Sequence, residues 1–365
     1  MDNNLIYMPT FRVRQQEIIV LKSFDFENHM YPLLEIVKEH DRARKTEAQK
    51  SFEEIHLEII QETTAQKVFV DLPVYLKQSG SMKDEVVAFS LSVINNIERR
   101  CEYINRLSPQ NEKVIPVISS YLLKTGEQGT IQQQVEFIRP NFNSIAFRLY
   151  PQSFSFDFPI VAELATADDY IIIDLDQIIP YHKSPPLRPI VTALSGFNNC
   201  CKIILRSAIN TDIQNVSLDH GNVVFEADNS QIDNDTMSGF GVNATGDYVG
   251  IKKDDLTAGG TISPGFIYYD AVENQYYGYK ATIKKDLSEF ENRIVPDVLN
   301  SDATQRMLDS NPIYLGEDNL GYNTLLRIRD GHESGKSQAK FKKISMDHYL
   351  YCIREKIRAE ILHQP

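Results

Sequence analysis

Eight short apolar segments rich in β-branched residues recur along the first 255 residues, and most of them end in a charged or polar residue. Stretches with helical character separate them. Apolar runs this continuous are typical of parallel strands covered on both faces, and the intervening helices supply the crossovers. Eight such units in about 250 residues match the size of a (β/α)8 barrel. The segments are Leu5–Phe11, Met30–Val37, Lys67–Leu76, Lys113–Ser119, Ser144–Tyr150, Tyr170–Asp176, Lys202–Ser207 and Asp247–Lys252.

We therefore predict an α/β fold, a (β/α)8 TIM-like barrel with a C-terminal β-hairpin and helices packed on it. An open doubly wound sheet is the other fold that such units build, and the count of eight favours the barrel. The last strand has two candidates, Asp247–Lys252 and Asn222–Ala227. The character of the sequence changes after residue 255, so we expect the barrel to span residues 1–258 and the extension residues 259–365.

Two local patterns give sharper predictions. Residues Lys83–Leu107 carry a broad apolar face at helical spacing, and a Ser-Pro pair follows, which predicts one long helix. Pro9 lies in the first apolar segment, and proline removes a hydrogen-bond donor from a strand. We therefore expect Pro9 to mark the end of that strand or a bulge.

Composition narrows the class of protein. The 365 residues are 42% hydrophobic and 24% charged, which is ordinary for a globular chain. The net charge of −12 argues against non-specific nucleic-acid binding. Four cysteines without a C-x-x-C pair fit a reducing compartment and structural roles. No signal peptide and no apolar run approaching the ~18 residues of a membrane span are visible. We expect a cytoplasmic protein without a membrane partner.

Candidate functional residues follow from the geometry of such barrels, whose sites lie at the carboxyl ends of the strands. Side chains that are far apart in sequence converge there in one mouth. The predicted strand ends deliver Glu35, Asp71, Ser119, Arg148, Asp174, Asp176, Arg206 and Asp247.

This set permits two kinds of arrangement. Glu35, Asp71 and Asp174 would offer the oxygen ligands that Mg²⁺ or Ca²⁺ prefers, and Arg148 with Arg206 would clamp a phosphate. The alternative is a buried network in which the arginines simply neutralise the carboxylates. The choice depends on register, because a shift of one residue turns a strand side chain from the lumen to the helices.

The histidines and tyrosines carry weaker signals. No H-x-H or H-E-x-x-H motif occurs, so a zinc site is not predicted. We expect His348, in the predicted helix Ser345–Leu362, to be at the surface or half-buried. The alternative is that it caps a neighbouring element or reaches the barrel mouth. Five tyrosines line the predicted hairpin, where a core position is favoured over a protein–protein contact. They are Tyr268, Tyr269, Tyr276, Tyr277 and Tyr279.

A further set of landmarks runs over most of the chain: Tyr7-Met8-Pro9 with Glu17, Tyr31–Glu35, the AFRLY segment around Arg148, IIIDLDQI around Asp174, Gly246-Asp247-Tyr248 and Ser345–Tyr349. Together these segments resemble the protein beta family, whose members occur in bacteria and on phages or mobile elements. The chain departs from the family pattern in having no tryptophan before the late histidine, and Tyr349 stands where the family has a second histidine. The resemblance implies a fold and a genomic setting, such as defence against phage, and no particular reaction.

The sequence supports two hypotheses of function, which belong to different classes of protein. The first is a barrel-fold accessory or sensor protein of a phage-linked or anti-phage defence locus, which binds a protein partner or a small phosphorylated ligand at the barrel mouth. The second is a metal-dependent phosphodiesterase or nuclease-like hydrolase that uses the strand-end carboxylates. The sequence leaves open whether the protein is an enzyme, and it predicts no cofactor beyond possible Mg²⁺ or Ca²⁺.

Overall fold

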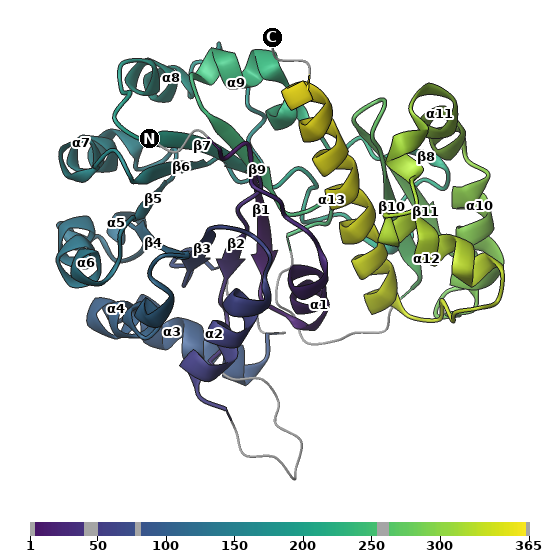
Figure 1. Ribbon diagram of the computed structural model, residues 1–365, viewed down its shortest axis with the longest axis horizontal. Helices are drawn as coiled ribbons and strands as arrows, with labels where there is room; N and C mark the ends of the chain where they lie inside the picture. The colour runs from purple at the N-terminus through teal and green to yellow at the C-terminus, as the bar shows by residue number, and fades with distance from the viewer. Residues whose placement is uncertain (1–3, 40–49, 77–81, 254–262, 363–365) are drawn as a thin grey trace.

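The computed structural model describes residues 4–39, 50–76, 82–253 and 263–362. Eight parallel strands close into a barrel, with helices on its outside (Figure 1). The predicted (β/α)8 fold is confirmed. The strands follow one another around the barrel as β1 (Tyr7–Arg12), β2 (Leu33–Glu35), β3 (Val68–Asp71), β4 (Val114–Ser119), β5 (Ala146–Leu149), β6 (Tyr170–Asp174), β7 (Cys201–Arg206) and β9 (Ala244–Asp247).

Helices connect successive strands. The predicted long helix Lys83–Leu107 is in fact two helices, because the chain breaks at Asn96, whose side chain accepts a hydrogen bond from the Arg99 N–H and caps the second helix. The helices of the barrel are α1 (Gln15–Ser23), α2 (Phe52–Glu62), α3 (Asp84–Ile94), α4 (Ile97–Asn105), α5 (Leu122–Thr125), α6 (Thr130–Ile138), α7 (Phe154–Leu164), α8 (Arg188–Ser195) and α9 (Asn234–Phe240).

The closing strand differs from both sequence candidates. Strand β9 ends at Asp247, where the predicted strand Asp247–Lys252 begins, and it pairs with β7 on one side and β1 on the other. The competing segment forms the two-residue strand β8 (Asn222–Val223), which pairs with the C-terminal hairpin. Pro9 lies inside β1 opposite Asp247, so the expected strand end or bulge at Pro9 is wrong.

The C-terminal part packs against the barrel through α13, which lies between the barrel and the small sheet in Figure 1. Helix α13 contacts both α1 and β10, and its Lys342 pairs with Glu17 of α1 at 2.5 Å. The predicted boundary at 258/259 falls outside the described residues. The elements here are β10 (Gly265–Asp270), β11 (Gln275–Lys280), α10 (Val295–Leu299), α11 (Asp302–Ser310), α12 (Leu320–Arg329) and α13 (Gln338–Leu362).

Aromatic side chains fill this junction. Tyr268, Tyr269, Tyr276 and Tyr279 are buried, which confirms the core interpretation for four of the five hairpin tyrosines. Tyr277 is half-buried, and its hydroxyl accepts a hydrogen bond from Arg306. The expectation for His348 is wrong, because its side chain is fully buried and stacks on Tyr268. The four cysteines are buried and unbridged: Cys101, Cys200, Cys201 and Cys352.

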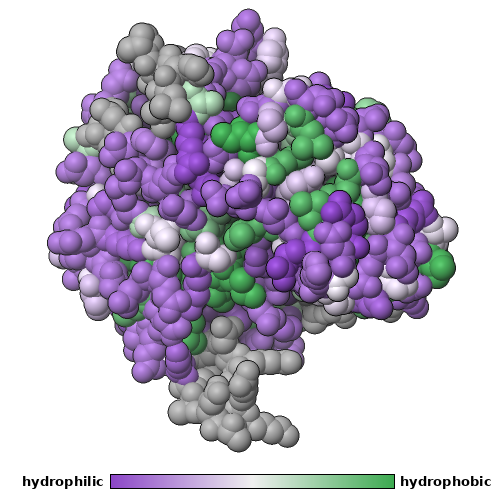
Figure 2. All heavy atoms as spheres, turned by 45° about the vertical axis from the view of Figure 1, so that its right-hand side comes forward, coloured by the Kyte–Doolittle hydropathy of each residue, from purple (hydrophilic) through white to green (hydrophobic). Residues whose placement is uncertain are grey.

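The face turned toward the viewer in Figure 2 is mostly hydrophilic, with hydrophobic patches between the polar side chains. Within the described residues, no helix is long and apolar enough to cross a membrane.

Candidate functional site at the barrel mouth

The alternation of strand side chains decides which residues enter the lumen. Met8, Leu33, Phe69 and Leu205 belong to the apolar cluster that fills the barrel, whereas their sequence neighbours pack outward against the helices. Because side chains on a strand alternate between its two faces, every second residue toward the carboxyl end also faces the lumen, and those above the apolar cluster are polar. They are Arg12, Glu35, Asp71, Ser119, Arg148, Asp174 and, just past β9, Tyr248.

Arg148 stands at the centre of this polar layer. Its Nε and Nη2 donate to Asp174 Oδ2 at 3.0 and 2.5 Å, and its Nη1 reaches Asp71 Oδ2 at 2.7 Å. Nη1 also pairs with Glu35 Oε1 at 2.9 Å, and Nη2 donates to the Tyr248 hydroxyl at 3.2 Å. All five donors of the guanidinium therefore have protein partners.

Two further arginines complete the neutralisation of the carboxylates. Arg12 Nε donates to Glu35 at 2.9 Å. Arg100, which is fully buried on α4, donates to Asp71 at 2.9 Å and also reaches the carbonyls of Leu72 and Val117. Three buried carboxylates thus face three buried arginines, as a network of buried charges requires.

The electrostatics keep Glu35 ionised. Burial alone would raise the pKa of its carboxyl, but Arg148 and Arg12 together hold that pKa well below its usual range. The Tyr248 hydroxyl donates to Glu35 Oε1 at 2.9 Å. Glu35 is therefore a stable anion with several donors, and a poor general base.

The turn after β9 is strained where it delivers Tyr248. Val249 has φ of 49° and Gly250 has φ of 69°. The left-handed region is costly for a β-branched residue, and such strain persists only where the surroundings impose it. The Val249 N–H donates to Asp247 Oδ1 at 2.7 Å, which fixes the turn.

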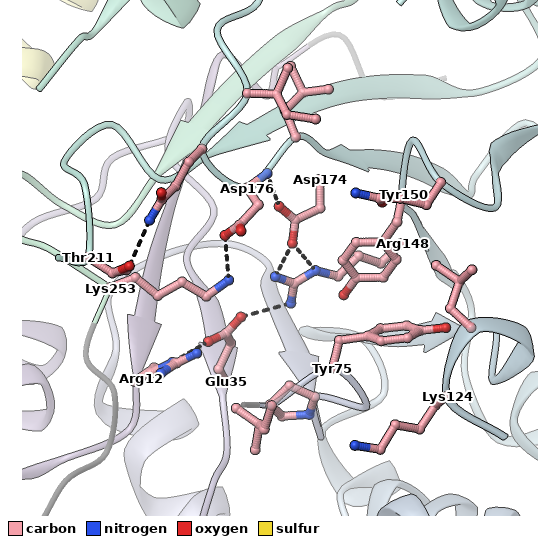
Figure 3. Close-up of a pocket in the computed structure, with 17 residues that line it drawn as sticks. Arg12, Glu35, Tyr75, Lys124, Arg148, Tyr150, Asp174, Asp176, Thr211 and Lys253 are labelled. Atoms are coloured by element: carbon pink, nitrogen blue, oxygen red, sulfur yellow. Dashed lines mark hydrogen bonds and ion pairs between the residues drawn. The ribbon is translucent and has the colours of Figure 1, made fainter. Parts of the chain in front are cut away.

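A cavity of about 610 Å³ opens above this layer (Figure 3). Its floor includes Glu35, Arg148 and Asp174, and its sides come from the segments that follow β3 to β7 and β9. Its volume falls within the roughly 300–1,000 Å³ typical of small-molecule sites. The remaining lining residues are Arg12, Pro73, Tyr75, Leu76, Leu123, Lys124, Tyr150, Gln152, Leu175, Asp176, Gln177, Ile178, Thr211 and Lys253.

Four of the predicted site residues line this cavity: Glu35, Arg148, Asp174 and Asp176. Asp176 has φ of 51°, and its carboxylate pairs with Lys253 at 3.2 Å.

Two other predicted residues are buried deeper. Asp71 is completely buried beneath the layer and lies outside the cavity lining. Ser119 is also buried, and its hydroxyl has no hydrogen-bond partner among the described residues.

The structure does not bring Arg206 and Asp247 to the cavity. Their neighbours Leu205 and Tyr248 face the lumen, so these two point outward. Arg206 pairs with Asp228 at 2.5 Å. Asp247 accepts hydrogen bonds from the hydroxyls of Tyr7, at 2.7 Å, and Tyr349. Burial raises the pKa of Asp247, and these hydrogen bonds oppose that rise.

The sequence analysis missed several residues of the polar layer and of the cavity lining. Arg12 is one residue beyond the predicted first strand, so the strand-end rule applied to the true end would have found it. Tyr248 is the lumen-facing neighbour of the predicted Asp247. Lys124, Tyr150 and Lys253 lie at or beyond strand ends, where the pattern carries no signal for the direction of the side chain.

The carboxylates do not surround an open centre. Glu35, Asp71 and Asp174 converge on the Arg148 guanidinium, which occupies the position that a shared cation would take. In the described parts of the chain, no group of three or more His, Cys, Asp or Glu side chains has the arrangement of a metal site.

Comparison with known proteins identifies a family. The sequence model of the family described as Beta protein matches residues 7–354, nearly the whole chain. No curated protein matches the chain.

Proposed function

We propose, from the premise that this chain belongs to the Beta protein family, that it is a barrel-fold accessory or sensor protein that binds a small ligand at the barrel mouth. The observation that carries the proposal is the cavity of about 610 Å³ at the carboxyl ends of the strands. Concave sites of this size with placed polar groups among apolar and aromatic side chains are the usual form of a ligand site. This cavity combines its apolar and aromatic side chains with seven charged ones.

The charge network favours binding over catalysis. Arg148 has no free donor, and Glu35 and Asp174 are held by arginines. Groups paired in this way form a rigid, preorganised floor, which lowers the cost of ordering a bound ligand. A catalytic acid or base would instead need a group with a pKa near the working pH.

A screen of small polar metabolites by thermal unfolding tests this proposal. A ligand at a hundred times its Kd stabilises the folded protein by about 2.7 kcal/mol, which raises Tm measurably. We expect at least one class of metabolite to raise the Tm of the wild-type chain.

A matched pair of variants locates the binding. Leu123 lines the cavity and is 48% exposed, whereas Leu308 on α11 is 40% exposed and lies outside the lining. Leu123→Trp is expected to weaken binding by crowding the cavity, and Leu308→Trp is expected to leave it unchanged. Equal binding by both variants, or no stabilising metabolite at all, would count against a site at the barrel mouth.

The phage-linked setting is a separate part of the proposal, and its support is the family membership. We expect cells that express the protein with its neighbouring genes to change the plaque count of at least one phage. Leu123→Trp should abolish that change and Leu308→Trp should preserve it. Unchanged plaque counts across a broad phage panel would remove the defence role and leave the binding role standing.

A metal-dependent phosphodiesterase is the second candidate, and the lumen-facing carboxylates at the strand ends favour it. A cation there would have to displace the Arg148 guanidinium, which makes this candidate the weaker one. Calorimetry with Mg²⁺, Mn²⁺ and Ca²⁺ distinguishes the two. Binding heat that disappears in Glu35→Gln and Asp174→Asn would support the hydrolase.

A further inference from the structure

We infer that the ligand is a small planar aromatic molecule that carries a negatively charged group, either phosphate or carboxylate. Its ring would lie against Tyr75 and Tyr150, and its charged group would meet Lys124 and the Tyr150 hydroxyl. This inference rests on the proposed binding function and adds the chemical class of the ligand.

The charges of the cavity wall favour an anion. The wall holds four cations, Arg12, Lys124, Arg148 and Lys253, and three carboxylates, Glu35, Asp174 and Asp176. Every one of these carboxylates already accepts an ion pair from an arginine or lysine of the wall. A cationic ligand would have to break one of those pairs, whereas an anion needs no such loss.

Two donors remain for the anion. Lys124, in the last turn of α5, is exposed at the cavity edge and has no ion pair with any described residue. The Tyr150 hydroxyl likewise makes no hydrogen bond within the described chain. Burial raises the pKa of Tyr150 well above its usual value, so the hydroxyl keeps its proton and can donate.

The aromatic wall favours a planar ring. Tyr75 and Tyr150 meet edge to face, with ring centroids 4.6 Å apart at 66°, and Tyr75 is anchored by its hydrogen bond to the Ser120 carbonyl at 2.6 Å. Pro73, Leu76 and Leu123 add apolar surface. A ring that stacks on one tyrosine meets the edge of the other, an arrangement that aromatic groups prefer.

The aromatic and the basic parts of the wall lie on one side of the same cavity. In Figure 3, Lys124 is on the same side of the cavity as Tyr75 and Tyr150, and Arg12 and Lys253 are on the opposite side. A ring at the tyrosines therefore has its charged group near Lys124, with the ion-paired floor below it.

Calorimetry with paired probes on the full chain tests the inference. Adenosine 5′-monophosphate and adenosine share a ring and differ in a phosphate, while indole-3-acetate and tryptamine share a ring and carry opposite charges. We expect the anion of at least one pair to bind at least tenfold more tightly than its partner. The pair that responds distinguishes a phosphate from a carboxylate. Ribose 5-phosphate, which has the charge without the ring, should bind at least tenfold more weakly than the monophosphate.

Two variants test the contacts to the charged group. Lys124→Ala should weaken the anionic probe at least fivefold, and Lys284→Ala, at an exposed lysine outside the lining, should leave it unchanged. Tyr150→Phe keeps the ring and removes only the hydroxyl, so it should weaken the anion more than its neutral or cationic partner.

The outcomes distinguish this inference from the proposed function. If the chain binds neutral or cationic metabolites in the thermal screen and neither anionic probe, the ligand class is wrong and the binding function stands. If it binds nothing in either experiment, both fail. Anion binding that Lys124→Ala leaves unchanged would also overturn the inference.

Discussion

At the scale of single residues, the floor of the cavity depends on Arg148. One guanidinium joins carboxylates from three strands and is 2% exposed. A buried ion pair contributes only modestly to the net stability of a fold. The loss of one partner, however, leaves the other charges buried without compensation, which is strongly destabilising. We therefore expect the removal of Arg148 to destabilise the polar layer at the mouth more than the removal of any other residue in it.

Replacement of Arg148 by Met is expected to lower the free energy of unfolding by about 3–5 kcal/mol, because it strips Glu35, Asp71 and Asp174 of their shared partner. Urea denaturation followed by circular dichroism measures the change. Arg327→Met is the control, since Arg327 is 61% exposed and its pair with Glu333 should be worth less than about 1 kcal/mol. Similar losses in the two variants would show that the network is not a stabilising unit.

His348 gives a pH dependence of known sign. Burial lowers its pKa from 6.5 to about 4, although its hydrogen bond to the Tyr269 carbonyl opposes the shift. Between these two values the unfolded chain binds a proton that the folded chain does not. The contribution of His348 to stability is therefore complete above about pH 6.5 and is lost as the pH falls toward 4.

We expect the wild-type chain to lose up to about 3 kcal/mol of stability through this group between pH 6.5 and 4. Urea denaturation at a series of pH values measures the loss. His348→Asn should be less stable at pH 7 and should show a shallower pH dependence across this window. A slope that is the same in both proteins would assign the effect to other groups.

At the scale of elements, the two-residue period of the strands separates the predicted site residues that face the lumen from those that face outward. Glu35 and Arg148 have the parity of the lumen, and Arg206 and Asp247 have the opposite parity. The strained turn after β9 then places Tyr248 over the floor and Gly250 against the ring of Tyr349. The end of β9 and the turn after it therefore together determine where the Tyr248 side chain lies.

Gly250→Ala tests that turn. A Cβ at Gly250 would lie 2.5 Å from the Tyr349 ring, and φ is 69°. Gly126 has a similar φ of 76° but nothing within 4 Å of the added atom. Gly126→Ala should cost about 1–2 kcal/mol, which is the strain alone. Gly250→Ala should cost at least about 2 kcal/mol more because it adds overpacking. Equal unfolding free energies of the two variants would show that the turn relaxes.

At the scale of the whole molecule, the C-terminal part is joined to the barrel by buried contacts. Tyr349 of α13 donates to Asp247 at the end of β9, and β8, which precedes the barrel's last strand, pairs with β11. The apolar face of α13 includes Phe341, Leu350 and Ile353, all buried. Such shared burial couples the folding of the two parts.

We therefore expect the full chain to unfold in one cooperative transition, with coincident far-ultraviolet circular dichroism and tyrosine fluorescence curves. A chain that stops after Ser337 lacks α13 and should lose this cooperativity and bind a hydrophobic dye. Lys336→Ala, with a half-exposed side chain just before α13, serves as the control and should behave like the wild type. Two separate transitions in the full chain would show that the parts fold independently.

The sequence by itself determined the barrel, because apolar segments and helices alternate eight times and a closed parallel sheet buries them all. It also nominated Glu35, Arg148, Asp174 and Asp176, since a strand end is a local property. The eighth strand was misplaced because the true strand, Ala244–Asp247, is short and contains Thr, Gly and Asp where an apolar run was sought.

Only the tertiary structure decided which strand-end residues meet. The direction of a side chain depends on strand register, and register is fixed by pairing with strands distant in sequence. For this reason the side chains of Arg206 and Asp247, which were predicted to face the mouth, point outward. Those of Arg12, Tyr248 and Lys253, which were not predicted, lie at the mouth. The guanidinium of Arg148 between three carboxylates is likewise a property of the closed barrel, because no local pattern places residues 35, 71, 148 and 174 around one point.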